Sequence, residues 1–482
     1  MVIFNRFWKV IISENILTLN YFDCRQFKNP GQVKKTRKGP DMKKIIFAVG
    51  LIIMLAVAGT PLLSGLITQR IIKQSFDDIN QMYVDTGSDI FIEIQQYEKK
   101  YFSSQIEWKI KLGALKSLYG VEEIVFIDRI DHGFSNVVSK TSLEKNKWFM
   151  DFVDNKLEGK NPIAVTTEYK LSGDIKTTIV LDAFSFKDGN TVFEIKPGQI
   201  VVAFGKDLNN IFSEMSWAGC SIPGKFSVDN LLANSKMEKN YTYIWEGMTS
   251  LSIENIKAVG TKESFEMADL KCDYELNFNK PENELSIGLG NSIKSITMGQ
   301  GKIQDIFSKI NINNIDAMGY EEFMASYSQI LNNAMAQIET EKTHPDTMKK
   351  VFEKQMASIG RKLLGAYEKF LKKGFEIQIT DARAQLPQGN IKGDIILSLK
   401  KDVTMGKLVP IVIQPSKALD IFYLKSNVRM PYELFGENHM LLSQIYPGMQ
   451  TGLFLKEGEN VIHKAETLDG KLLLNGKEVL LN

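Results

Sequence analysis

Cysteine and histidine are scarce in this sequence, and their scarcity removes several kinds of site. The cysteines are Cys24, Cys220 and Cys272, and none belongs to a C-x-x-C motif, which excludes a zinc ribbon or a thioredoxin-like redox site. The four histidines lie far apart in the chain, and no H-E-x-x-H motif occurs. We therefore predict no metal site and no cofactor.

The chain also lacks an excess of charge of either sign. Lys and Arg together number 59, and Asp and Glu number 57, so there is no clearly basic domain of the kind that nucleic-acid binding requires. We expect no nucleic-acid partner. Because 44% of the 482 residues are hydrophobic, the chain can form at least one large core and is neither disordered nor fibrous.

Catalytic motifs are missing as well. Residues 219–224 resemble a nucleophile elbow but have one residue too many, and residues 142–145 match S-x-x-K without its companion motifs. The glycine pairs at 288/290 and 299/301 lack the third glycine of a dinucleotide-binding loop. We therefore predict that the protein is not an enzyme and assign no catalytic residue.

One weak candidate site follows a strand predicted at residues 124–127. Asp131, His132 and Gly133 are consecutive there, and a carboxylate beside a histidine can orient an imidazole for base catalysis. The same residues are typical of a turn in which aspartate accepts hydrogen bonds from backbone amides and glycine has a positive φ. We favour the turn.

A long apolar run near the N-terminus predicts a transmembrane helix. Residues 45–67 carry no charge, and this run of about 23 residues exceeds the 20 or so that a spanning helix needs. Lys and Arg are concentrated at residues 34–44, so the positive-inside rule predicts a cytoplasmic N-terminus and a large domain on the far side. A signal peptide cleaved after Ala56-Val57-Ala58 is the alternative.

The segments on either side of this run have different characters. Residues 1–41 show no helical or strand period, whereas Met42-Lys43-Lys44 is an ordinary start for a signal anchor. We interpret residues 1–41 as an extension that is not translated, with a cytoplasmic tail as the alternative. Residues 42–67 are then the signal anchor, and the apolar spacing within 68–85 predicts a helical stalk.

Cys220 and Cys272 both follow the predicted membrane segment. A disulfide between them is expected if that side of the membrane is oxidising. Two free thiols are an equal alternative, because the sequence does not give the distance between two cysteines.

Strand patterns dominate most of the remaining chain. Residues 105–112 and 272–278 alternate with period two, and many short strands separated by turn residues predict an antiparallel sheet. We expect a β-rich region at 86–318 and a C-terminal β region at 375–482. In the latter, Asp469-Gly470 and Asn475-Gly476 are the expected two-residue hairpin turns.

Residues 319–374 between these regions predict a helical hairpin. Apolar residues from Tyr320 to Ile338 recur every three or four positions, and a second such stripe runs from Val351 to Phe370 before Lys372-Lys373-Gly374 ends the helix. The stripes indicate core packing, with a ligand groove as the alternative. The predicted fold class is α+β, mostly antiparallel β, with one N-terminal transmembrane helix and a central pair of amphipathic helices.

The order of several motifs matches a known family. The matching pieces are Met42-Lys43-Lys44 with its apolar run, Tyr101-Phe102-Ser103-Ser104, Asp131-His132-Gly133, the two central helices and Leu474-Asn475-Gly476-Lys477. In this order, over residues 42–482, the chain resembles the YdgA-like family of bacterial inner-membrane-anchored periplasmic proteins of unknown function. It departs from the family at Phe134, where members often have proline. The resemblance implies a single-pass inner-membrane protein, mostly periplasmic, and a homodimer.

Three functional hypotheses follow. The first is a non-enzymatic, inner-membrane-anchored binding or scaffold module that contacts the lipid bilayer and another envelope component or itself. The second is a lipid or apolar-ligand binding or transfer protein, which requires an elongated apolar cavity. The third is an unrecognised hydrolase, which requires a cleft containing a carboxylate, serine or histidine with a strongly perturbed pKa. We favour the first.

Overall fold

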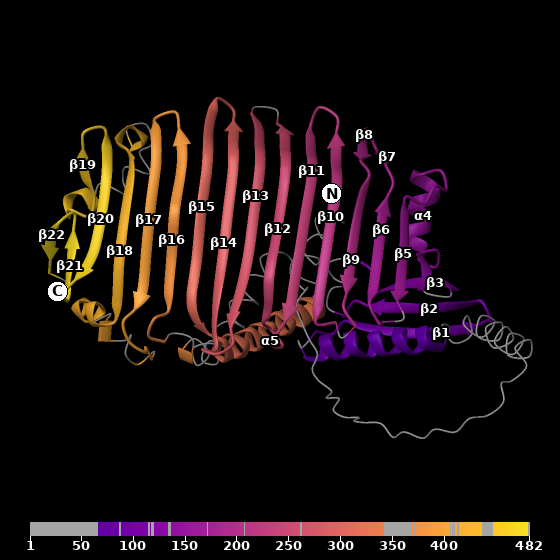
Figure 1. The fold of residues 1–482 in the computed structure, drawn as a ribbon. Coiled ribbons are helices and arrows are strands. Elements are labelled where there is room, and N and C mark those ends of the chain that lie inside the picture. The colour runs from indigo at the N-terminus through magenta and orange to yellow at the C-terminus, as the bar shows by residue number, and fades with distance from the viewer. Residues whose placement is uncertain are drawn as a thin grey trace, which may run out of the picture.

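The computed structural model describes residues 66–341, 368–369 and 372–480 of the chain. Within these bounds the gaps are 86–87, 114–115, 117–119, 134–135, 171, 207, 261–262, 405, 407–409, 412–413 and 436–446. The 22 strands of the described residues form one antiparallel sheet (Figure 1).

The strands fall into three groups along the chain. The first group is β1 (Phe91–Lys99), β2 (Ser103–Lys111), β3 (Glu123–His132), β4 (Asn136–Ser142), β5 (Ile163–Lys170), β6 (Ile175–Leu181), β7 (Phe184–Asp188), β8 (Thr191–Ile195) and β9 (Gly198–Phe204). The second is β10 (Asn210–Ile222), β11 (Phe226–Lys239), β12 (Trp245–Val259), β13 (Ser264–Asn279), β14 (Glu284–Met298) and β15 (Gly301–Asp316). The third is β16 (Glu376–Leu386), β17 (Gly389–Leu399), β18 (Phe422–Pro431), β19 (Leu455–Glu457), β20 (Asn460–Leu468), β21 (Lys471–Leu474) and β22 (Lys477–Val479).

Strands that follow one another in the chain are mostly neighbours in the sheet. β1 to β6 pair in sequence, β9 pairs with β6 and β10, and the order then continues from β10 to β18. β18 pairs with β20, which leads to β21 and β22. The β7–β8 hairpin pairs with β10, and β19 pairs with β20. Many of these neighbours are joined by short hairpin turns, as antiparallel pairing allows, whereas one helix lies between β4 and β5 and another between β15 and β16.

The central strands are longer than the sequence patterns predict. β10 to β15 have 13 to 16 residues each, whereas strands of about 5–6 residues are the commonest. The predicted strand at 272–278 is one half of β13. The prediction of many short strands was wrong here because Asn, Asp and Gly inside these strands resemble turn residues.

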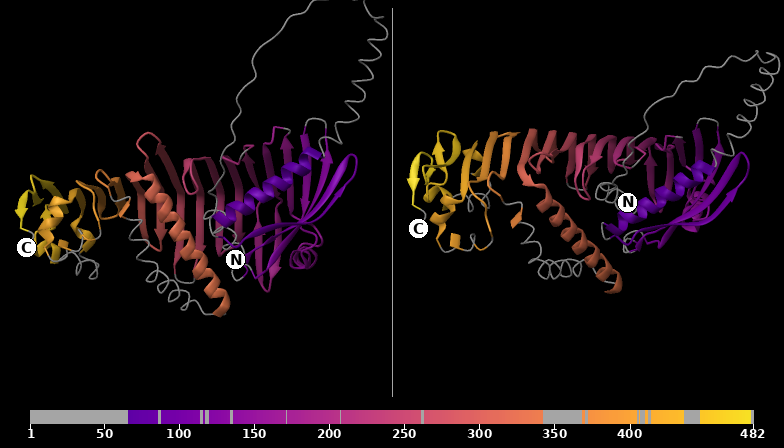
Figure 2. Two further views of the ribbon diagram at one scale, coloured as in Figure 1. Left: turned by 90° about the horizontal axis from the view of Figure 1, so that it is seen from below. Right: turned by 60° about the horizontal axis from the view of Figure 1, so that its bottom comes forward.

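Two helices cover one face of the sheet. Residues 66–85 form a helix whose Ile72 packs against Ile106, Ile130 and Tyr169 of the N-terminal strands. The second helix, α5 (Ala317–Glu341), begins directly after β15 and crosses the same face, as the views in Figure 2 show. Side chains near its first turn, such as Ala317, join a core with residues of β13, β14 and β15. The opposite face carries none of these helices.

A shorter helix lies near the N-terminal end of the sheet. The helix α4 (Lys147–Lys156) connects β4 with β5 and buries Phe149 and Val153. Two 3-10 turns, η2 (Pro415–Asp420) and η3 (Tyr432–Phe435), flank β18.

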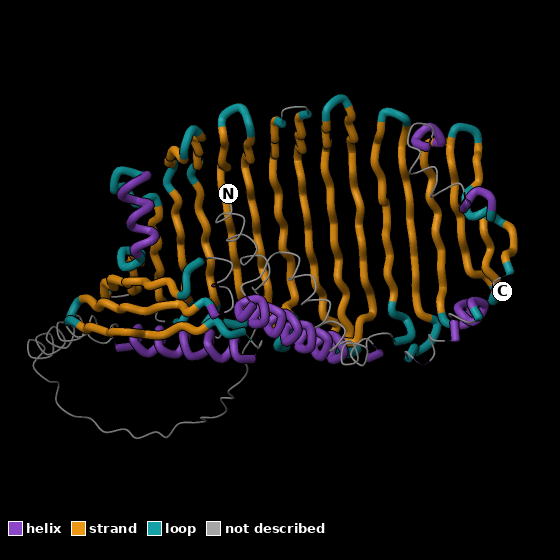
Figure 3. The backbone as a smooth tube through the Cα atoms, turned by 180° about the vertical axis from the view of Figure 1, so that it is seen from behind, coloured by secondary structure: helices purple, strands orange, loops and turns teal. Residues whose placement is uncertain are grey.

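One edge of the sheet is closed by a side chain of the 66–85 helix. Asn80 donates its amide N–H to the carbonyl oxygen of Ile92 and accepts the Ile92 backbone N–H, both at 2.7 Å. Figure 3 shows this helix beside β1. The amide thereby takes the place of a neighbouring strand at one point of an otherwise unpaired edge, which disfavours edge-to-edge association.

The C-terminal turns agree with the sequence prediction. Asp469 and Gly470 have φ values of 49° and 74°, and Asn475 and Gly476 have 48° and 80°. Two successive positive φ values are the signature of type I′ turns, which match the twist of the flanking strands.

The predicted fold class needs correction. The protein is a mostly antiparallel β protein built on one large sheet, and the prediction of an α+β fold with a transmembrane helix was wrong. Among the described residues, no helix is both long enough and apolar enough to cross a bilayer. Residues 45–65 of the predicted membrane segment lie outside the described residues. The first helix of the predicted central hairpin is α5. Of the second predicted helix, residues 351–367 and 370–371 lie outside the described residues, and only residues 368–369 are described before residue 372.

Candidate functional site

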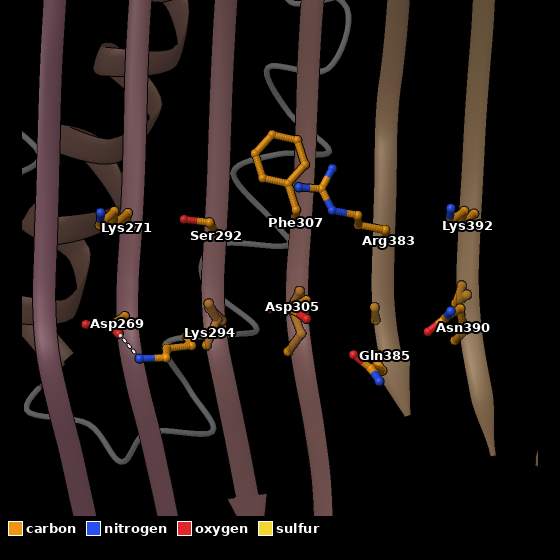
Figure 4. Close-up of a pocket in the computed structure, with 14 residues that line it drawn as sticks. Asp269, Lys271, Ser292, Lys294, Asp305, Phe307, Arg383, Gln385, Asn390 and Lys392 are labelled. Atoms are coloured by element: carbon orange, nitrogen blue, oxygen red, sulfur yellow. Dashed lines mark ion pairs between the residues drawn. The ribbon is translucent and has the colours of Figure 1, made fainter. Parts of the chain in front are cut away.

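An open trough lies across five central strands, on the face without helices. Leu276 of β13 packs in the core beneath α5. Side chains alternate between the two faces of a strand, so Lys271, five residues before Leu276, points to the opposite face, which has no helices. The trough has a volume of about 610 Å³. Figure 4 shows its side chains in two rows across the strands. One row is Lys271, Ser292, Phe307, Arg383 and Lys392, and the other is Asp269, Lys294, Asp305, Gln385 and Asn390.

The hollow forms where the strands depart from regular geometry. Asp269, Asp305 and Asp381 have φ values of 51°, 48° and 52°, in the left-handed region that Asp and Asn tolerate better than other side chains. The register between β15 and β16 shifts on both sides of Phe307. Such bulges bend a strand and redirect its side chains. The sequence therefore builds the trough with aspartates placed inside long strands.

Positive charge dominates the lining. Four cationic side chains and two carboxylates line the trough. Lys294 pairs with Asp269 at 3.2 Å, and Arg383 pairs with Asp381 just outside the lining. Lys271 and Lys392 have no ion-pair partner among the described residues. Their charges are therefore available to a ligand.

Arg383 has two side-chain contacts, one with Phe307 and one with Asp381. Its guanidinium carbon lies 4.4 Å from the centroid of the Phe307 ring, within cation–π range. Together with the Asp381 ion pair, this contact holds the guanidinium above the trough floor. A guanidinium held in this way can bind a carboxylate or phosphate with two hydrogen bonds.

The predicted candidate at Asp131-His132-Gly133 lies elsewhere, at the N-terminal end of the sheet. His132 is the last residue of β3 and is 6% exposed. Its Nε2 lies 2.9 Å from Ser104 Oγ, and its Nδ1 lies 3.4 Å from the carbonyl oxygen of Tyr101. Asp131, the next residue along the strand, points to the other face and lines a small hollow of about 150 Å³ with Lys100 and others. It does not orient the imidazole.

Gly133 begins the connection between β3 and β4, as the turn prediction requires. Its φ is not positive, in contrast to what we expected. A Cβ atom at this position would lie 2.3 Å from the carbonyl oxygen of Asn136, so glycine is needed for the close approach of two backbone segments.

The Ser104–His132 contact has the spacing of a nucleophile and its base. However, Ser104 is 4% exposed and its Oγ also accepts a hydrogen bond from the hydroxyl of Tyr97. A second pair of the same kind joins β18 and β20, where Ser426 Oγ lies 2.8 Å from His463 Nε2 and Leu453 supplies the carbonyl at Nδ1. The same serine–histidine contact at two places between neighbouring strands is best explained as a cross-strand bridge.

A buried carboxylate lies in the same N-terminal core, and the sequence analysis missed it. Asp128 is 4% exposed, and its Oδ2 accepts a hydrogen bond of 3.0 Å from the indole of Trp108. Burial raises the pKa of Asp128. A signal was present, since Asp128 alternates in phase with Phe126 and Ile130, on the apolar side of β3.

A second buried charge lies where α5 meets the β11–β12 turn. The Nζ atom of Lys239 is enclosed and has no hydrogen-bond partner among the described residues. Burial lowers the pKa of Lys239 to about 8, against the opposing effect of Glu321 and Asp85. Glu321 of α5 accepts the backbone N–H of Tyr243, which fixes the helix to the turn. Because 82 residues separate Lys239 from Glu321 in the sequence, no local pattern reveals this cluster.

Cys220 and Cys272 are free thiols in the structure, so the disulfide considered from the sequence is not formed. Cys220 lies on β10 and Cys272 on β13, with β11 and β12 between them. Three strand spacings, together with the offset along the strands, separate them by about 20 Å. A disulfide needs Cα atoms less than about 7 Å apart.

Comparison with known proteins gives one match. A family model described as "Bacterial protein of unknown function (DUF945)" matches residues 42–482. No curated protein and no solved structure matches the chain.

Proposed function

The chain belongs to the DUF945 family of bacterial proteins of unknown function, and from this premise we propose that it is a non-enzymatic binding module of the cell envelope. The trough on the helix-free face is the surface that contacts its partner, which is another envelope component. The observation that carries this proposal is the trough itself, with two unpaired lysines and an arginine that contacts Phe307.

The difference between the two faces of the sheet supports a binding role. The helices 66–85 and α5 pack their apolar side chains on one face, so the core that stabilises the sheet lies there. The other face does not contact these two helices. Across the trough most of its side chains are charged or polar, whereas Phe212, Leu232 and Met248 are exposed on the same face over β10 to β12. A mostly polar lining suits a reversible contact with a partner.

The chemistry of the trough disfavours an apolar-ligand carrier. Charged and amide side chains contribute most of its lining, and it is open to solvent along its length. A lipid-transfer cavity requires an apolar lining that buries the ligand. The lining exposes more polar than apolar surface, which does not suit an acyl chain.

Among the described residues, the Ser104–His132 pair has the spacing of a hydrolase's nucleophile and base. Both side chains are closed off from solvent, and a backbone carbonyl, not a carboxylate, faces the second imidazole nitrogen. We therefore assign no catalytic role to it. A hydrolytic activity of the purified protein that disappears in the Ser104→Ala variant would overturn the non-enzymatic assignment.

The periplasmic side of the inner membrane is the proposed site of action. The resemblance of residues 42–482 to YdgA-like periplasmic proteins supports this location, and the free thiols are compatible with either side of the membrane. A second copy of the chain is the alternative partner, since the same resemblance implies a homodimer.

The proposal can be tested by photo-cross-linking in bacterial cells. A photoreactive amino acid replaces Ser292 on the trough floor or, as a control, Ser216, which lies in the same register row four strands away on β10. Four strand spacings are about 19 Å, beyond the reach of the probe at the trough. We expect a cross-linked product at position 292 and none at 216.

Two results would change the assignment. A product with twice the mass of the chain would make self-association the function of the trough. Equal yields at the two positions, or no product at either, would contradict a binding role for the trough.

A further inference from the structure

Three cations of the trough, Lys271, Arg383 and Lys392, form part of a longer row. Lys271 pairs in register with Ser292, Ser292 with Phe307, Phe307 with Arg383, and Arg383 with Lys392. The next residue of the row is Arg429 on β18. The four cations thus lie on one line that runs across the strands from β13 to β18.

The length of this row excludes a small ion as its ligand. Five strand spacings separate Lys271 from Arg429, which is about 24 Å. A single phosphate or carboxylate can contact one or two neighbouring cations but cannot reach the others. A ligand that uses the whole row must be a chain that carries anionic groups at intervals.

The cations in the row are largely uncommitted. Lys271, Lys392 and Arg429 have no ion-pair partner among the described residues, whereas Arg383 stacks on Phe307 and pairs with Asp381. All four side chains are exposed. An anion would replace water at the three unpaired cations and would share the Arg383 guanidinium with Asp381.

The neutral side chains narrow the chemistry of the ligand. Ser292 lies within the cationic row, and Gln385 and Asn390 lie beside Arg383 and Lys392 in the adjacent row of the trough. A hydroxyl and two amides can each donate and accept hydrogen bonds. Sugar hydroxyls are matched by groups of this kind, whereas the linkages of a polyphosphate chain offer acceptors only.

We propose that this cationic row binds a linear acidic polysaccharide, which lies across the strands with its carboxylates on the cations and its hydroxyls on the amides. This inference rests on the proposed function, because it names the class of envelope component that the trough takes. The evenly balanced charge of the whole chain distinguishes the row from the extended basic surface that nucleic acids require.

The test measures binding of fluorescent oligogalacturonate to the purified full-length chain by anisotropy. Neutral dextran, polyphosphate and a single-stranded oligonucleotide serve as competitors. We expect oligogalacturonate to bind and to be released by added salt, because screening weakens exposed charge pairs. Dextran should not compete, and polyphosphate and the oligonucleotide should compete less well than unlabelled oligogalacturonate.

Variants then assign the binding to the row. Lys271→Gln and Lys392→Gln should each raise the Kd by up to about fivefold, the upper range for an exposed ion pair. The two lysines lie far apart, so their effects should multiply, and the double variant should raise the Kd by up to about 25-fold. Lys236→Gln is the matched control, an exposed lysine on β11 outside the row. It should leave the Kd unchanged.

An unchanged Kd in the double variant would overturn the proposal. So would effective competition by dextran, or stronger binding of polyphosphate or the oligonucleotide than of oligogalacturonate. If position 292 cross-links in cells but the purified chain does not bind the polysaccharide, the proposed class of ligand is wrong and the proposed binding function stands. If position 292 yields no product, the proposed function itself fails.

Discussion

Replacement of Lys239 by methionine tests the account of the buried charge beneath α5. The Lys239 Nζ atom is enclosed without a hydrogen-bond partner among the described residues, and burial lowers its pKa from 10.5 to about 8. A Lys239→Met variant keeps the length of the side chain and removes the ammonium. Because the folded state no longer has to desolvate a charge, we expect the variant to be more stable than the natural protein.

The size of the effect follows from the pKa change. The difference between 10.5 and about 8 corresponds to about 3 kcal/mol of destabilisation, at roughly 1.4 kcal/mol per tenfold change in acidity. Since the side chain is only half-buried, solvent screening reduces this to about 1–2 kcal/mol. Urea unfolding at pH 7 should show a gain of that size in the free energy of unfolding.

The pH dependence provides a sharper criterion. Below pH 8 the lysine is charged in both folded and unfolded chains, so the full cost is present. As the pH rises from 8 towards 10.5, the folded state loses its proton first, and the cost declines. The gain from Lys239→Met should therefore shrink between pH 7 and pH 10.

A control separates this effect from a general benefit of removing charge. Lys236 lies three residues earlier on β11 and is exposed, so Lys236→Met should change stability by less than about 0.5 kcal/mol. A Lys239→Met variant that is less stable than the natural protein, or whose gain is the same at pH 7 and pH 10, would refute the reasoning.

Three further substitutions probe other parts of the structure. Asn80→Ala removes both hydrogen bonds to Ile92 and should cost about 1–3 kcal/mol in urea unfolding, whereas a cost near zero would show that the edge needs no such closure. Asp128→Asn should stabilise the protein at pH 7 and not below pH 3.8. Burial raises the pKa of the Asp128 carboxyl, so the free-energy cost of the buried carboxylate appears only as the pH rises above 3.8. An equal change in stability at both pH values would contradict this. Gly219→Ala should lower the free energy of unfolding by at least about 1–3 kcal/mol, because φ of Gly219 is 116° and the new Cβ would lie 1.8 Å from the Val228 carbonyl oxygen. An unchanged thermal unfolding temperature would contradict this.

Features that depend on neighbouring residues could be predicted from the sequence. The turns at Asp469-Gly470 and Asn475-Gly476 were predicted because two residues with positive φ suffice to define them. The helix α5 was predicted from the spacing of its apolar residues, a signal that also lies within one segment. The antiparallel character of the sheet followed from the many alternating segments, although their true lengths did not.

Features that depend on distant residues could not be predicted. Asp269 and Asp305 resemble turn residues in the sequence, and only the partners in the adjacent strands keep each of them within a continuous strand. Lys271 and Lys392 belong to one trough because the register of β13 to β17 aligns them. Nothing near either lysine in the sequence marks it as part of a site.

We propose that the helix-free face binds an envelope component through its cationic trough. The most direct measurement compares photo-cross-linking from position 292 in cells between the natural protein and the Lys271→Gln/Lys392→Gln double variant, at matched protein levels. We predict a product in the natural protein and a loss of most of it in the double variant. The two substitutions lie on exposed side chains, so the two proteins should have the same fold and differ only in charge. A product of equal yield in the two proteins would contradict the claim that the trough cations bind the partner.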